Sequence, residues 1–148
     1  MNKEQEVEFY NKFPSVLKAK LANNEISFPD GTQFEFCPIL AYRGISRNKN
    51  DNTPVNSQDM LSHYERKIVP RGISNYESDA KYYAVSLFET IDMLKECWKF
   101  PRPNKKIAQG YIYKEGGPQY TDLKKHISWW LYENIDFNGF TIKDDLNE

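Results

Sequence analysis

“PILAYRGI”, residues 38–45, is a mainly apolar run of strand length, and we expect it to form a buried β-strand. “KYYAVSLF”, residues 81–88, is aromatic and apolar and predicts a second strand. In “HISWWLYE”, residues 126–133, a third predicted strand sends Trp129 and Trp130 to opposite faces. The sequence therefore predicts strands that lie far apart along the chain.

Helical periodicity occurs before and between these strands. Residues 1–24 carry apolar side chains at helical spacing, with Pro14 forcing a kink or opening a second helix. A helix is also expected from Asn56 to Ile68, with Asn56 or Ser57 as its cap, and another over “ETIDMLKECWKF”, residues 89–100. The chain thus mixes helices with strands.

Turn signals add hairpins to this pattern. “EISFPDGTQFEF”, residues 25–36, predicts a hairpin of residues 26–28 and 33–36 around Asp30-Gly31. Gly116-Gly117-Pro118 predicts a further turn. Hairpins mixed with helices favour the α+β class.

We therefore predict an α+β fold with a mostly antiparallel sheet and about three helices. Residues 1–148 are expected to form a single globular domain. Within it, residues 1–24 should form a helical segment that packs on the rest, and residues 143–148 should form a flexible tail.

The composition limits the function classes. Lys and Arg number 20 against 21 Asp and Glu, so the chain lacks the global positive field that drives nonspecific nucleic-acid binding. Cys37 and Cys97 have no metal-ligand spacing, which indicates a reducing cytosol. No apolar run approaches the roughly 20 residues of a membrane span, and the first residues have no signal-peptide core. We expect a cytoplasmic protein without a membrane partner.

Arg43 stands inside the first predicted strand and is followed by Gly44. A guanidinium offers five donors in a rigid fork that suits a carboxylate or a phosphate. Gly44 would let a ligand approach the backbone closely. Arg43 is thus either the anchor of an anion site or a structural residue paired with one of the many acids.

Ser86 interrupts an apolar strand, so its hydroxyl needs a partner, either a neighbouring carbonyl or a ligand. No G-x-S-x-G elbow surrounds it, which argues against a hydrolase nucleophile. Glu133 follows the third predicted strand, where a carboxylate either is solvated or stabilises a cationic sugar centre.

The two histidines are His63 and His126. With no third histidine and no cysteine at ligand spacing, they do not indicate a zinc site, and we predict no metal. His126 is either a satisfied hydrogen-bonding residue or one of a pair. If the fold brings the pair together, they could serve as the acid and base of a metal-independent ribonuclease.

The order of these features resembles the ADP-ribosyltransferase superfamily: an arginine in “AYRGI”, a serine in “YAVSLF” before a helix, and a late glutamate. The resemblance implies NAD as substrate, with Arg43 anchoring NAD, Ser86 shaping the nicotinamide-ribose pocket and Glu133 assisting transfer of ADP-ribose. The sequence departs from the family at Val85-Ser86-Leu87, where Ser-Thr-Ser is usual, and at Leu131, where Glu or Gln is usual.

The working prediction is an anion pocket for a nucleotide such as NAD. Arg43, Ser86 and Trp130 would bind the ligand, and His126 and Glu133 would be catalytic. No cofactor is predicted apart from NAD as a substrate.

A rival prediction is a noncatalytic protein that binds a protein partner, such as an immunity or antitoxin-like module of a toxin or phage-defence locus. It would use Trp129 or Trp130 and the acidic tail, because tryptophan is a favoured interface anchor.

Overall fold

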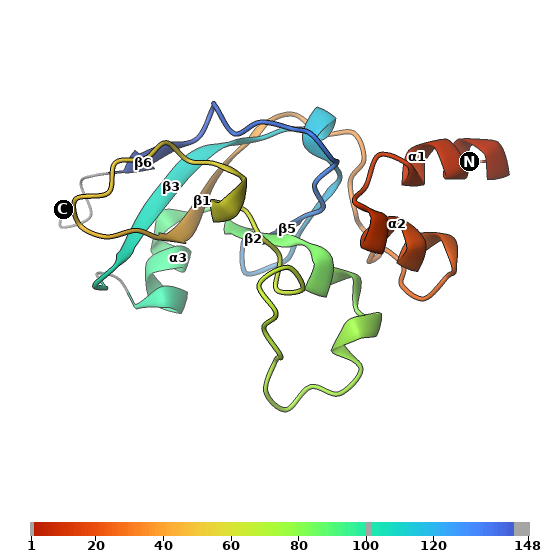
Figure 1. Ribbon diagram of the computed structural model, residues 1–148, viewed down its shortest axis with the longest axis horizontal. Helices are drawn as coiled ribbons and strands as arrows, with labels where there is room; N and C mark the ends of the chain where they lie inside the picture. The colour runs from red at the N-terminus through yellow and green to blue at the C-terminus, as the bar shows by residue number, and fades with distance from the viewer. Residues whose placement is uncertain (1, 100–101, 144–148) are drawn as a thin grey trace.

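The computed structural model describes residues 2–99 and 102–143, which form a single antiparallel sheet with helices beside it (Figure 1). The strands are β1 Ile39–Ser46, β2 Val85–Phe88, β3 Lys105–Ile112, β4 Gln119–Thr121, β5 His126–Trp129 and β6 Thr141–Lys143. The α-helices are α1 Lys3–Tyr10, α2 Ser15–Ala22 and α3 Ile91–Trp98. The predicted α+β class, with an antiparallel sheet and three helices, is confirmed.

Across the sheet the strands lie in the order β4, β5, β2, β1, β3, β6. β1 pairs with β3 along its whole length, but it meets β2 only at Tyr42 and Phe88. β2 instead pairs over four positions with β5. The sheet is therefore splayed between β1 and β2, and this is where the side chain of Arg43 reaches across.

The two N-terminal helices lie at one end of the sheet (Figure 1). α2 begins directly after Pro14, and it buries Leu17 and Leu21. These leucines belong to an apolar cluster that also contains Phe13 and Trp130. The N-terminal segment is thus two short helices held by apolar contact with the chain that follows β5.

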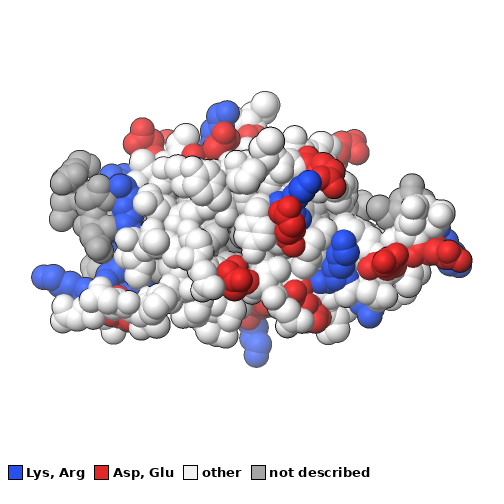
Figure 2. Space-filling model, turned by 90° about the horizontal axis from the view of Figure 1, so that it is seen from above, with Lys and Arg blue, Asp and Glu red and all other residues white. Residues whose placement is uncertain are grey.

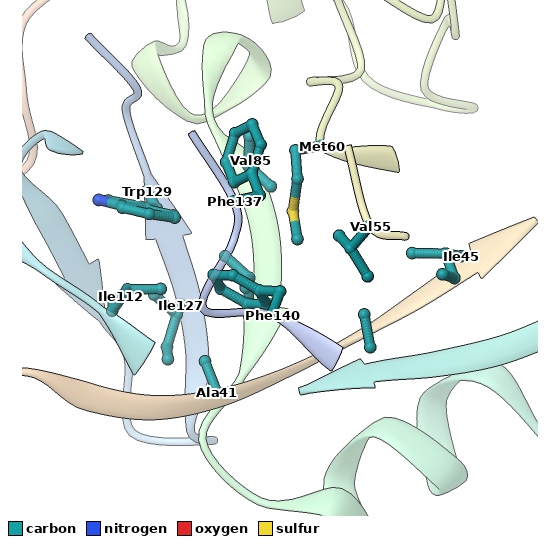
Figure 3. Packing of buried hydrophobic residues seen from close by; sticks show 12 residues of the cluster. Ala41, Ile45, Val55, Met60, Val85, Ile112, Ile127, Trp129, Phe137 and Phe140 are labelled. Carbon is teal, nitrogen blue, oxygen red and sulfur yellow. The ribbon is translucent and has the colours of Figure 1, made fainter. Parts of the chain in front are cut away.

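One face of the sheet is covered mainly by loops, not by helices (Figure 3). Ile45, Ile127 and Trp129 from three strands pack in one buried cluster with Met60 and Phe140 from the covering loops. On the other face, Leu94 of α3 packs with side chains of β2 and β3. The predicted helical stripe of α3 is confirmed by this burial.

The glycine beside Arg43 faces α3. A Cβ atom on Gly44 would lie 2.7 Å from the Trp98 ring, so the tryptophan occupies the space next to this backbone. The expectation that a ligand approaches Gly44 is wrong, because a core side chain already does so.

The helix predicted from Asn56 to Ile68 is wrong. Only Ser57–Asp59 forms a short 3-10 helix, which Asn56 caps as predicted. The reason is that arginine side chains take the local acceptors: Arg43 binds the carbonyls of Asp59 and Leu61. These carbonyls are then not used for helical hydrogen bonds.

The hairpin predicted over residues 25–36 is also wrong, because this segment contains no strand. The backbone of Gln33 pairs instead with a residue far away in the sequence, since Gln33 and Gln119 form an isolated antiparallel bridge. Lys143, which was expected in the tail, belongs to β6. The rest of that expected tail, residues 144–148, lies outside the described residues.

On the face shown in Figure 2, acidic and basic side chains are interspersed, and no broad field of one sign is visible there. Within residues 2–99 and 102–143, no helix is long and apolar enough to cross a membrane.

Candidate functional site

A cavity of about 390 Å³ lies beside the junction of β1 and β2. The loop from Leu61 to Tyr82 supplies much of its wall, and this loop projects from the sheet in Figure 1. Its lining residues with charged or imidazole side chains are Arg43, His63, Arg66, Asp79, Lys81 and His126. Asp79 is the single carboxylate among the described residues that line the cavity, so the wall is cationic.

Arg43 is buried, with 5% of its surface exposed. Its Nε donates to the carbonyl of Asp59 at 2.7 Å, Nη1 to that of Ser86 at 2.6 Å and Nη2 to that of Leu61 at 3.0 Å. The guanidinium therefore joins β1, β2 and the covering loop. It is a structural residue, as one of the two interpretations predicted, but its partners are carbonyls and not an acid.

The charge of Arg43 is poorly compensated. Its pKa is lowered to about 10, mainly by burial and also by nearby Arg66, while Asp59 and Glu65 oppose the change. The carboxylate of Asp59 is engaged by Arg47, whose Nη2 lies 2.5 Å from Asp59 Oδ2. Arg43 and Arg66 thus place two like charges at one cavity wall.

Ser86 and His126 meet on neighbouring strands. Ser86 Oγ lies 2.5 Å from His126 Nε2. On the other side of the ring, His126 Nδ1 lies 4.0 Å from Asp122 Oδ2. Asp122 is itself held, because its Oδ1 accepts from the backbone N–H of Lys124 and of His126. A hydroxyl, an imidazole and a carboxylate therefore lie in sequence, and the first two line the cavity.

Both histidines line the cavity. Burial lowers the pKa of His126, and Lys81 and His63 lower it further against the opposing effect of Asp122. Burial also lowers the pKa of His63, with Arg66 and Arg43 acting in the same direction. Both rings are therefore disposed to be neutral near pH 7, where one nitrogen of each accepts a proton.

Glu133 and Trp130 lie elsewhere. Glu133 is exposed, and its backbone N–H donates to Lys12, away from the residues that line the cavity. Trp130 is fully buried, and its Nε1 donates to the carbonyl of Ala80 at 2.8 Å. Trp129 is fully buried as well, so neither tryptophan offers a face to a base or a partner.

Of the predicted site residues, the structure brings together Arg43, Ser86 and His126, and it leaves out Glu133 and Trp130. Sequence reasoning missed Arg66, Lys81 and Asp122. Arg66 lies in the segment for which the sequence predicts a helix, and Lys81 is the first residue of the strand predicted over residues 81–88. In neither segment does the pattern of apolar residues single out the charged side chain. Asp122 was detectable in principle, because an aspartate four residues before a histidine at a strand start can cap the turn between them.

No group of three or more histidine, cysteine or acidic side chains able to hold a metal ion occurs in residues 2–99 and 102–143. Comparisons of the chain with protein-family models, with curated proteins and with solved structures find no match. The resemblance to ADP-ribosyltransferases stays a prediction.

Proposed function

We propose that the cavity beside β1 and β2 binds a phosphorylated nucleotide of the NAD type. Arg66 and Lys81 would contact the phosphates, and Ser86 and His126 would contact a ribose hydroxyl. Arg43 would attract the phosphates through its positive charge without contacting them, since its nitrogens already donate to carbonyls.

The observation that carries this proposal is the cluster of like charges. Arg43, His63 and Arg66 line the same cavity, and Arg66 lowers the pKa of the other two. Among the described residues Arg66 has no ion-pair partner. A bound anion would relieve this repulsion, and it would gain from several cations at once.

The size and lining of the cavity suit such a ligand. A volume of about 390 Å³ is within the range of small-molecule sites, roughly 300–1,000 Å³. Tyr76, Tyr82 and Trp98 add aromatic surface to the lining. Aromatic surface beside cations is the combination that a base with its phosphates requires.

The proposal concerns binding and assigns no role to Glu133. Transfer of ADP-ribose calls for a carboxylate near the cationic sugar centre, and Glu133 does not line the cavity. A transfer activity would therefore depend on Asp79, which does line it.

Titration calorimetry tests the proposal with NAD, ADP-ribose and inorganic phosphate as separate ligands. We expect NAD or ADP-ribose to bind the wild type, and Arg66→Gln to weaken that binding by about tenfold or more, which is the loss of one charge-assisted contact. Arg71→Gln is the matched control, because Arg71 is an exposed arginine of the same loop that does not line the cavity. The absence of binding by all three ligands at millimolar concentration, or equal losses in both variants, would refute it.

A metal-independent ribonuclease is the second candidate, and one observation favours it: His63 and His126 line the same cavity, which their spacing in the sequence did not show. One ring would take the proton of the attacking 2′-hydroxyl, and the other would protonate the departing 5′-oxygen. Cleavage of a short RNA in the presence of a chelator tests it. His63→Gln and His126→Gln should each abolish cleavage, and cleavage by either variant at the wild-type rate would contradict it.

A further inference from the structure

We propose that Ser86 is a nucleophile, activated by His126 and positioned through Asp122, that attacks the phosphorus of a phosphate ester. This goes beyond nucleotide binding, because Ser86 would form a covalent bond with the ligand. It also differs from ribonuclease chemistry, in which the RNA supplies its own nucleophile.

The first argument is the order of the three groups. Ser86 Oγ contacts Nε2 of His126 at 2.5 Å, while Asp122 faces Nδ1 of the same ring at 4.0 Å. At 4.0 Å the carboxylate makes no hydrogen bond to the ring, and its negative charge favours the tautomer with its proton on Nδ1, which leaves Nε2 free to accept the proton of the serine. Such a constellation is identified by geometry and not by a sequence motif, so the missing G-x-S-x-G elbow does not exclude it.

The second argument is that the groups are held in place. Ser86 and His126 lie on β2 and β5, which pair over four positions. Asp122 is fixed by two hydrogen bonds from backbone N–H groups. An arrangement built on paired strands and a fixed turn keeps its geometry better than one built on loops.

The third argument concerns the electrophile. The same cavity wall carries Arg66 and Lys81, which would stabilise negative charge that develops on phosphoryl oxygens. Ser128 is a second serine with which Ser86 can be compared, because it lies opposite Ser86 in the strand register and also lines the cavity. The contact with the histidine sets Ser86 apart from it.

The reaction balances with water as the co-reactant. Ser86 Oγ bonds to phosphorus, the bond from phosphorus to the leaving oxygen breaks, and the hydroxyl proton passes to His126 Nε2 and then to that oxygen. Water then attacks the phosphoserine, gives one proton to Nε2, and the serine regains it as phosphate leaves.

Covalent labelling of the full chain with diisopropyl fluorophosphate tests the proposal. In this reaction fluoride leaves, and the diisopropylphosphoryl group stays on the nucleophile. We expect peptide mass spectrometry of the wild type to locate one adduct on Ser86. Ser86→Ala should lose the adduct, and Ser128→Ala should keep it. Thermal unfolding of each variant shows that it is folded.

His126→Gln should slow labelling by about 100-fold or more, the usual contribution of a general base. Asp122→Asn keeps the two backbone hydrogen bonds that the carboxylate accepts, and it tests the positioning role. It should slow labelling about tenfold, and it should move the midpoint of the pH–rate profile to lower pH. The groups that face His126 are Asp122, Lys81, His63, Ser86 and Phe88, and Asp122 is the one that raises its pKa.

No adduct on Ser86 of the folded wild type would overturn the proposal, as would labelling that persists at the same rate in His126→Gln. These results are separable from nucleotide binding. Nucleotide binding is measured separately by calorimetry on the wild type and on Arg66→Gln, so labelling can fail while binding holds, and binding can fail while labelling holds.

Discussion

Replacing Arg43 with alanine tests whether this arginine holds the sheet to its covering loop. The substitution removes all three hydrogen bonds that the guanidinium donates to carbonyls, those of Asp59, Leu61 and Ser86. Each of these buried acceptors then costs roughly 1–3 kcal/mol if it stays without a partner. The lost bonds span two strands and one loop, so no single neighbour can replace them.

An opposing contribution comes from the buried charge. The fall in the pKa of Arg43 from 12.5 to about 10 means that folding disfavours the charged form. At 1.36 kcal/mol per pKa unit, this amounts to about 3 kcal/mol that the substitution would recover. Three unpaired carbonyls together cost roughly 3–9 kcal/mol. After the recovery a fall of about 0–6 kcal/mol in the free energy of unfolding is left, and we expect a value near the middle of this range, about 3 kcal/mol.

Urea unfolding followed by tryptophan fluorescence measures this change. Arg66→Ala is the control, since Arg66 is exposed and should change the free energy of unfolding by less than about 0.5 kcal/mol. Arg43→Lys keeps the charge but cannot span three carbonyls in one plane, so it should recover less than half of the loss. An Arg43→Ala variant within about 0.5 kcal/mol of the wild type would refute the structural role.

Three further predictions concern stability. Gly117→Ala should lower the free energy of unfolding by more than about 3 kcal/mol, because the φ of Gly117 is 140° and a Cβ atom would lie 1.8 Å from the carbonyl oxygen of Trp130. Gly72→Ala is the control, since Gly72 has φ 70° with nothing within 4 Å of an added Cβ atom, and it should lower the free energy of unfolding by only about 1 kcal/mol. Equal losses for the two variants in urea unfolding would contradict this prediction. Trp130→Ala should cost about 3–5 kcal/mol as a core truncation; a stable variant that loses only partner binding would instead support the rival prediction. Burial lowers the pKa of His126 below 6.5, so the unfolded chain takes up a proton at this residue first as pH falls. The stability that comes from the neutral ring is therefore complete above pH 6.5 and falls below it. In thermal melts His126→Gln should reduce the dependence of the melting temperature on pH, and an unchanged dependence would be inconsistent with the burial.

The sequence predicted the elements whose pattern is local. The structure confirms β1 and α3, and it confirms one half of each of the other two predicted strands, as β2 and β5. Of the strand predicted over residues 81–88 only Val85–Phe88 is a strand, because Ala80–Tyr83 forms a 3-10 helix, and the strand predicted over residues 126–133 ends at Trp129. The predictions failed in segments whose local conformation is determined by contacts with residues far away in the sequence. The region after Asn56 has a helical pattern, but Arg43 takes two of its carbonyls from another strand.

The candidate site was also predicted only in part, because contacts between distant residues determine which side chains reach it. The prediction that the guanidinium of Arg43, the hydroxyl of Ser86 and the carboxylate of Glu133 converge holds only for the first two, which line one cavity together with His126. It failed for Glu133, because the chain leaves the sheet after Trp129 and carries the glutamate to the N-terminal helices. Where a strand ends cannot be read from alternation alone, since “HISWWLYE” alternates beyond the point where pairing stops.

The role of Arg43 bears on where an anion would bind. A guanidinium that already donates to three carbonyls has few donors left, so it acts on a ligand mainly through its charge. Arg66 lowers the pKa of Arg43, so the two cations repel each other where they line the cavity. The arginine that the sequence singles out therefore builds the wall, and the exposed arginine that the sequence does not single out is the one with donors to offer.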